Sequence, residues 1–243
     1  MGDTLALMKA RNFDAILLDL DGTLVDTLGD FVLALNGMFA DVFAHPSLRT
    51  FPGPAPQIQT QEVTLMVGKG SEHLVQQALR WAQTNTPDLH DLDLLALNPL
   101  ALTRYQAHYA HTNGLKATLY PGVQAGLEHC HVAGLPLVCL TNKPERFARE
   151  LLAKMNCLAY FKKVIGGDTY EHKKPHPLPL IKACEFLNTQ PQRTLMVGDS
   201  VNDVQAARAA QCPVVLVNYG YNHGLPAESA GADRVIDSLE ELI

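Results

Sequence analysis

Short, continuously apolar segments recur along the chain, and they constrain the fold more than any other sequence feature. They cover residues 15–18, 137–140, 164–165, 195–197 and 214–217. A continuous apolar run, unlike an alternating one, is typical of a strand buried on both faces of a parallel sheet. Helical patterns separate these runs, at residues 122–132, 178–187 and 204–210. The alternation predicts right-handed βαβ units and a doubly wound, mostly parallel α/β sheet.

Residues 29–117 follow a different pattern. Apolar residues fall at helical spacing after Phe31 and again after Leu74, and residues 100–111 predict a third helix. Prolines at positions 46, 52, 54 and 56 exclude regular helix between the first two. We therefore expect an α/β unit of residues 1–28 and 118–243, carrying a helical insert of residues 29–117. A capping-box pattern beginning at Ser238 predicts a short terminal helix.

Composition excludes several classes of protein. No apolar run reaches the roughly 18 residues that a membrane helix needs, and the N-terminus lacks a signal-peptide pattern, so a cytoplasmic protein is expected. The net charge of −6 disfavours nucleic acid as a partner. Five scattered cysteines indicate small core residues rather than a disulfide framework or a zinc site. A monomer and a homodimer both remain open.

Asp19 and Asp21 stand directly after the first predicted strand. Open α/β sheets bind their ligands at the carboxyl ends of the strands, so this position favours function. Two ionised carboxylates in one pocket are costly unless a cation lies between them. The simpler alternative is a turn, because the pair Asp21-Gly22 is common in turns.

A second acidic pair, Asp199 and Asp203, follows the strand at 195–197. One acid before a helix is explained as a cap that favours the helix dipole. Four acids at two strand ends are not explained in this way. Oxygen ligands around a pocket of phosphate size indicate Mg²⁺.

Thr141 and Asn142 follow a third strand, and Lys174 precedes a proline. A hydroxyl, a main-chain N–H and an ammonium group can bind phosphoryl oxygens, although a polar turn and a solvated lysine are the simpler readings. Taken together, these groups predict a reaction. Asp19 attacks a phosphate ester, Asp21 protonates the leaving alcohol and then activates water, and Mg²⁺ and Lys174 offset charge repulsion.

The four segments, in this order, resemble the haloacid dehalogenase superfamily of phosphohydrolases. The matching motifs are residues 19–26, Thr141-Asn142-Lys143, Lys174-Pro175 and Gly198-Asp199-Ser200 with Asp203. The resemblance implies a Rossmann-like core, with the helical insert as a small cap that closes over the substrate.

The same resemblance implies roles for single residues. Asp19 is the expected nucleophile and Asp21 the expected acid and base. Mg²⁺ is expected to bind the carboxylates of Asp19 and Asp199 and the main-chain carbonyl of Asp21, with Asp203 supporting the metal site from behind. A small anionic phosphate ester is the expected substrate.

Within the superfamily the chain is most similar to the bacterial phosphoglycolate phosphatases, which implies hydrolysis of 2-phosphoglycolate to glycolate and phosphate. The similarity extends to residues 164–168, 173–177, 198–207 and 219–222, and it is weakest at residues 43–61. Lys69 lies between two glycines, and we expect it or a neighbouring N–H to bind the far end of the substrate. The alternative is a surface lysine in a turn between helices.

Other functions remain open at this stage. A sugar-phosphate phosphatase or a phosphomutase of the same superfamily would use the same motifs. A receiver domain, which is a signalling module, also builds an acidic magnesium pocket around a phosphorylated aspartate. The chain length, the helical insert and a nucleophile on the first strand argue against a receiver. A purely binding role requires Asp21 to be catalytically silent.

Overall fold

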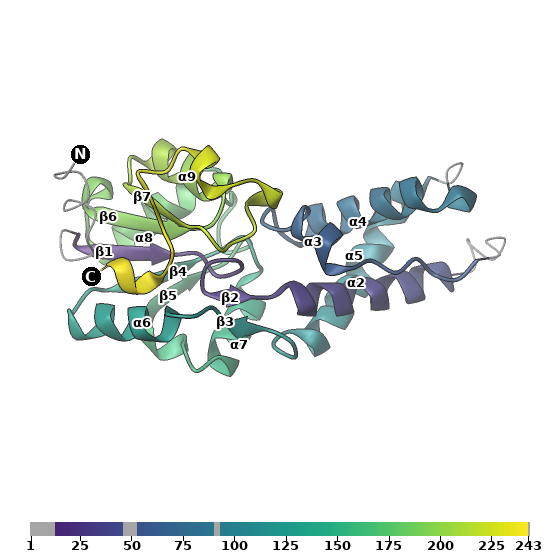
Figure 1. The fold of residues 1–243 in the computed structure, drawn as a ribbon, viewed down its shortest axis with the longest axis horizontal. Coiled ribbons are helices and arrows are strands. Elements are labelled where there is room, and N and C mark those ends of the chain that lie inside the picture. Colours follow the sequence, from purple (N-terminus) through teal and green to yellow (C-terminus); the bar gives the residue numbers. More distant parts are fainter. Residues whose placement is uncertain (1–12, 46–52, 90–92, 243) are drawn as a thin grey trace. The chain divides into compact units, whose positions relative to one another are not determined.

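The computed structural model describes residues 13–45, 53–89 and 93–242. The chain forms two compact units, one of residues 1–26 and 118–243 and one of residues 27–117 (Figure 1). Two of the four predicted loop prolines, Pro46 and Pro52, lie outside the described residues. Pro54 and Pro56 lie in irregular chain that precedes the next helix.

The first unit is built on a six-stranded sheet. Its strands are β1 (Ala15–Leu18), β4 (Leu137–Leu140), β5 (Phe161–Ile165), β6 (Thr194–Gly198), β7 (Val214–Val217) and β8 (Arg234–Ile236). They lie in the order β5-β4-β1-β6-β7-β8, and every neighbouring pair is parallel. The predicted α/β class with a parallel sheet is confirmed. Strand β8 was not predicted, because only Ile236 of its three residues is buried.

Helices cover both faces of this sheet. They are α6 (Val123–Val132), α7 (Glu145–Lys154), α8 (Leu178–Leu187) and α9 (Val201–Ala210). Side chains of α8 and α9 pack against Leu17 of β1 and Met196 of β6, while α6 and α7 lie on the opposite side of the sheet (Figure 1). Burying a leucine or an isoleucine completely contributes about 1.5–3 kcal/mol to folding, which explains why all four residues of β1 are apolar.

Short 3₁₀ segments join these elements and end the chain. They are η5 (Leu158–Tyr160), η6 (Pro191–Arg193), η7 (Asn222–Gly224), η8 (Ala227–Ala230) and η9 (Leu239–Leu242). The predicted terminal helix is the 3₁₀ segment η9. Its cap forms as the sequence indicates, because the Glu241 carboxylate accepts a hydrogen bond from the Ser238 N–H at 3.2 Å.

The strand order places the functional motifs at one point of the sheet. From β1 the chain passes outward to β4 and β5, and then returns to β6 on the other side of β1. Where the order reverses, the connections diverge and leave a crevice at the carboxyl ends of the strands. Asp19, Thr141 and Asp199 follow β1, β4 and β6, which are neighbours at this reversal.

A two-stranded antiparallel pair lies where the chain leaves the first unit and returns to it. Strand β2 (Val25–Asp26) pairs with β3 (Thr118–Leu119). Each strand has only two residues, too few for a periodic pattern, and neither was predicted.

The second unit is helical over its described residues. It contains α2 (Leu28–Phe43), α3 (Thr60–Thr64), α4 (Ser71–Asn85), η3 (Pro87–Leu89), η4 (Leu94–Leu97) and α5 (Asn98–Thr112). The buried Asp30 carboxylate accepts hydrogen bonds from the N–H groups of Gly114, at 2.6 Å, and Lys116, at 2.7 Å. These bonds fasten the end of the unit to its first helix. Within the described part of the chain, no helix is both long and apolar enough to span a membrane.

Candidate active site

A tight loop after β1 positions Asp19. The main-chain N–H of Asp19 donates to Val197 O of β6 at 2.9 Å, so the residue stays in register with the sheet. The N–H groups of Leu24 and Val25 both donate to Leu20 O, which folds the chain back at once. Gly22 occupies this turn with φ of +85°, and a Cβ there would lie 2.4 Å from Asp199 Oδ2. Glycine therefore lets the β1 loop approach the β6 loop.

Lys174 joins two of the carboxylates. Its side chain is buried, and its Nζ lies 3.0 Å from Asp19 Oδ1 and 2.6 Å from Asp203 Oδ1. The ammonium also donates to Leu140 O at 2.9 Å, which anchors it to the end of β4. Asn142 holds the same loop, since its Nδ2 donates to Lys174 O at 2.9 Å. The lysine is a buried charge with three acceptors rather than a solvated surface group.

Asp203 is fully buried, and both of its carboxylate oxygens are engaged. Oδ1 binds Lys174, and Oδ2 accepts hydrogen bonds from the Ser200 N–H at 3.1 Å, the Ser200 hydroxyl at 2.9 Å and the Asp199 N–H at 3.3 Å. This capping-box arrangement begins α9. With its oxygens occupied, Asp203 is better suited to holding the loop and Lys174 than to direct ligation.

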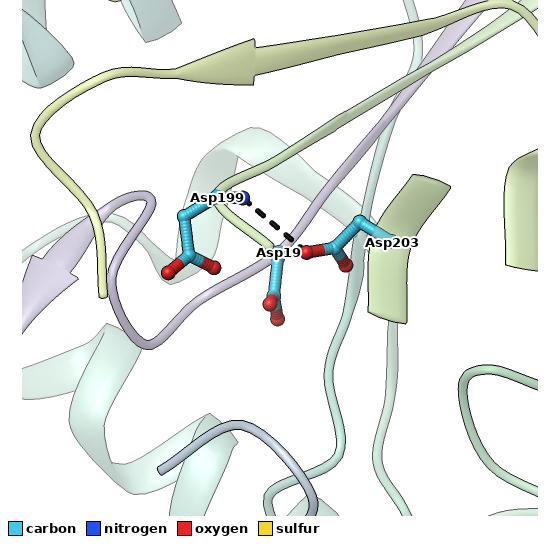
Figure 2. Close-up of side chains that lie close together, drawn as sticks. All are labelled: Asp19, Asp199 and Asp203. Atoms are coloured by element: carbon cyan, nitrogen blue, oxygen red, sulfur yellow. Dashed lines mark hydrogen bonds between the residues drawn. The ribbon is translucent and has the colours of Figure 1, made fainter. Parts of the chain in front are cut away.

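Main-chain groups of the loop after β7 hold one oxygen of the Asp199 carboxylate. Oδ2 accepts hydrogen bonds from the N–H groups of Tyr221, at 2.7 Å, and Asn222, at 3.5 Å. One carboxylate oxygen from each of Asp19, Asp199 and Asp203 lies within 4.8 Å of the others (Figure 2). Figure 2 shows Asp19 between the other two. Oxygen donors in such a buried cluster are the ligand set of a hard divalent cation.

The other predicted residues lie around this cluster. Asp21 Oδ1 is 2.5 Å from Nζ of Lys143, a lysine whose side chain is almost completely buried. Thr141 is buried, its N–H donates to Ile165 O of β5, and its hydroxyl accepts a hydrogen bond from the Lys143 N–H at 3.2 Å. Lys143 was not among the predicted site residues. Its place in the Thr141-Asn142-Lys143 motif was the available signal.

Burial and crowding of like charges perturb the acids. Burial raises the pKa of Asp19 to about 7; the Lys174 ammonium opposes the rise, and the Asp203 and Asp21 carboxylates add to it. Burial also raises the pKa of Asp199 well above its ordinary value, and Asp203 and Asp19 reinforce this. For Lys174, burial lowers the pKa, but the carboxylates of Asp19 and Asp203 outweigh it and the net pKa is raised. Lys174 is therefore a permanent cation.

The charge balance of the site favours a divalent cation. Four carboxylates, those of Asp19, Asp21, Asp199 and Asp203, face the two ammonium groups of Lys143 and Lys174. The formal charge with every acid ionised is −2. The raised pKa values of Asp19 and Asp199 agree with this excess of negative charge, because neighbouring carboxylates add to the effect of burial on both groups.

Lys69 belongs to the second unit, whereas the acidic cluster belongs to the first. It is exposed in the turn between α3 and α4, flanked by Gly68 and Gly70, whose φ values are +109° and +87°. The glycines therefore form a bent connection, as the sequence indicated. Its contact with substrate remains a prediction.

Known proteins resemble the chain over almost its full length. A family model described as haloacid dehalogenase-like hydrolase matches residues 13–211. The phosphoglycolate phosphatase of Thiobacillus denitrificans is 38% identical over 227 residues, 93% of this chain and 92% of that protein. A plasmid phosphoglycolate phosphatase of Cupriavidus necator is 40% identical over 229 residues, 94% of this chain and 90% of that protein.

Solved structures give the same result. The crystal structure of a predicted phosphoglycolate phosphatase from Haemophilus somnus 129PT has a TM-score of 0.84 and 30% sequence identity. The match covers 95% of this chain and 96% of that one. The similarity expected from the motifs is confirmed, and so is the expectation of an enzyme.

Proposed function

This chain belongs to the haloacid dehalogenase-like hydrolase family, and we propose that it is a magnesium-dependent phosphatase acting on 2-phosphoglycolate. The observation that carries the proposal is the buried cluster with a formal charge of −2 at the strand-order reversal. A divalent cation neutralises this excess, so a phosphate dianion meets a site of zero net charge, with the cation and Lys174 as local positive groups, rather than a repulsive one.

The residues present fit Mg²⁺. The carboxylates of Asp19 and Asp199 and the main-chain carbonyl of Asp21 are the proposed ligands, and Asp203 supports them through its contacts with the Asp199 N–H and with Lys174. When bound, Mg²⁺ supplies positive charge to a phosphoryl oxygen and neutralises part of the developing negative charge.

Asp19 is the proposed nucleophile. Its Oδ1 receives the Leu20 N–H at 2.7 Å and the Lys174 ammonium at 3.0 Å. Within the described residues Oδ2 receives no hydrogen bond, so one oxygen remains available. Attack on phosphorus forms an Asp19 acyl phosphate and breaks the ester P–O bond, and the alkoxide leaves. Thr141 and the Asn142 main chain are the proposed donors to the equatorial phosphoryl oxygens, and Lys174 supplies positive charge beside Asp19.

Asp21 is the proposed acid and base. It gives a proton to the leaving alkoxide and then takes one from water, which attacks phosphorus, breaks the Asp19–phosphate bond and restores Asp19. Its carboxylate forms an ion pair with the Lys143 ammonium. Proton donation in the first step requires this ion pair to open when substrate enters.

The proposed substrate rests on the names of the relatives. 2-Phosphoglycolate is a small ester with a carboxylate at its far end. We propose that the helical unit of residues 27–117 acts as a cap and that Lys69 binds this carboxylate. Lys69→Ala should then raise KM for 2-phosphoglycolate and leave KM unchanged for an aryl phosphate that has no carboxylate. Equal KM values for 2-phosphoglycolate in the variant and the wild type would exclude this role.

Phosphate release from a substrate panel tests the function. The panel contains 2-phosphoglycolate, hexose and pentose phosphates and an aryl phosphate, assayed with Mg²⁺ or with chelator for the wild type and for Asp19→Asn. We expect a preference for 2-phosphoglycolate that disappears with chelator and with the substitution. Preference for a sugar phosphate would reassign the substrate, and isomeric products would indicate a mutase. Full turnover by Asp19→Asn would refute the mechanism.

A further inference from the structure

The segment Tyr219–Asn222 follows β7 and has no role in the proposed reaction, yet it contacts the presumed metal ligand Asp199. The Tyr221 N–H donates to Asp199 Oδ2 at 2.7 Å. Gly220 makes this approach possible, because a Cβ at that position would lie 2.1 Å from Asp199 Cβ and 2.7 Å from Gly22 O. The loops after β1, β6 and β7 therefore meet at Asp199, and the main chain at Gly220 lies close to both Asp199 and the carbonyl of Gly22.

The Tyr221 side chain is fastened at its other end. Its ring is buried beside Gly22, where an added Cβ would lie 2.9 Å from Tyr221 Cδ2. Its hydroxyl donates to Asp26 Oδ1 at 3.2 Å. Asp26 is the last residue of β2, on the antiparallel pair where the chain leaves the first unit.

Two more tyrosines complete the cluster. The Tyr219 hydroxyl donates to Thr23 O at 3.0 Å, and its ring lies against the Tyr120 ring with centroids 4.4 Å apart. The Tyr120 hydroxyl is hydrogen-bonded to the Tyr221 hydroxyl. Burial raises the pKa of both Tyr120 and Tyr219, so these phenols are neutral donors at physiological pH.

We propose that Tyr221 is a positioning residue for the metal site: its hydroxyl, held by Asp26, fixes the main-chain N–H that orients the Asp199 carboxylate. The Asp199 carboxylate, held by this N–H, has an oxygen within 4.8 Å of a carboxylate oxygen of Asp19. Groups behind a metal ligand commonly change metal affinity by about 10–100-fold when they are removed. The inference rests on the proposed magnesium-dependent function.

Magnesium affinity, measured by calorimetric titration of the protein without substrate, tests the proposal. Tyr221→Phe keeps the ring and the N–H and removes only the hydroxyl. We expect Mg²⁺ binding about tenfold weaker in this variant. In turnover assays the Mg²⁺ concentration for half-maximal rate should rise by the same factor, while kcat at saturating Mg²⁺ changes less than about threefold.

Asp26→Asn is the conservative variant, because its amide oxygen still accepts the hydrogen bond. It should bind Mg²⁺ within about twofold of the wild type, whereas Asp26→Ala should match Tyr221→Phe. If one hydrogen bond carries the effect, the double variant Tyr221→Phe/Asp26→Ala loses no more affinity than either single variant.

Tyr160→Phe is the matched control. The Tyr160 hydroxyl donates to Glu128 Oε2 at 2.8 Å on an exposed face of the same unit, so the same atom is removed from a tyrosine–carboxylate pair elsewhere. The Mg²⁺ affinity of Tyr160→Phe should equal that of the wild type. Mg²⁺ affinity of Tyr221→Phe equal to the wild-type value would overturn the proposal. Failure of the wild type to bind Mg²⁺ would refute the proposed function itself, so the two failures are distinguishable.

Discussion

Replacing the nucleophile should stabilise the metal-free protein while it abolishes activity. Burial raises the pKa of Asp19 to about 7 from an ordinary value of 3.8. A carboxyl whose folded pKa is raised contributes its full stability below the unfolded pKa and loses that contribution as pH rises through the folded pKa. Asp19→Asn keeps a neutral group of similar shape at all pH values, so the variant avoids this loss.

The magnitude follows from linkage. Each pKa unit corresponds to about 1.36 kcal/mol, so the raised pKa of Asp19 lowers the free energy of unfolding by about 4 kcal/mol at pH 8 and about 2 kcal/mol at pH 5, relative to a group that stays neutral. We expect the free energy of unfolding of Asp19→Asn to exceed that of the wild type by these amounts. The difference cancels the pH dependence of groups that do not interact with Asp19. The Asp199 carboxyl does interact with it, and loss of the Asp19 charge lowers the pKa of Asp199, which adds to the stability of the variant at pH 8.

Urea denaturation with EDTA at pH 5 and pH 8, followed by circular dichroism, measures this difference. Saturating Mg²⁺ should reduce the difference in free energy of unfolding between the variant and the wild type at pH 8. The reason is that Mg²⁺ binding stabilises the wild type more than the variant, in which one proposed ligand is altered. Equal denaturation midpoints at both pH values, or a variant less stable than the wild type at pH 8, would refute the electrostatic argument.

Three further substitutions separate the roles of the other side chains. Lys174→Met should lower the free energy of unfolding by about 3–5 kcal/mol, measured by denaturation, because it leaves buried carboxylates without their cation; a loss below about 1 kcal/mol would contradict this. Lys143→Gln should reduce kcat at least about tenfold, whereas Mg²⁺ affinity measured by calorimetry should not fall, because the substitution removes a positive charge beside Asp21 and no proposed metal ligand. Thr141→Val should lower kcat/KM by about 10–100-fold and Thr141→Ser should restore most of it; equal loss in both would exclude a hydroxyl contact with phosphate.

The sheet could be predicted because its interior strands are apolar on both faces. Every residue of β1, β4 and β7 is buried, so the sequence signal is continuous over each strand. Strand β8 carries Arg234 and is only partly buried, and β2 and β3 are stabilised by their mutual pairing. The local sequence does not predict the β2–β3 pair, because that pair joins residues more than 90 positions apart.

Some residues of the candidate site could likewise be predicted from the sequence, and others could not. Asp19, Asp199 and Thr141 could be placed because each follows an apolar strand, and parallel strands bring such positions together. The ion pair between Asp21 and Lys143 joins residues 122 positions apart, and no local pattern specifies it. The Tyr221 N–H that binds Asp199 is a main-chain group, so residue type alone does not reveal its function.

The most direct test of the central claim is detection of a phosphoryl group on Asp19 during turnover. Enzyme and 2-phosphoglycolate with Mg²⁺ are quenched in acid within one turnover, and the peptide that contains Asp19 is analysed by mass spectrometry. We expect a phosphorylated Asp19 that increases when Asp21→Asn slows hydrolysis of the intermediate, and none in Asp19→Asn. Rapid turnover with no phosphoryl group on Asp19 in either the wild type or Asp21→Asn would contradict this claim.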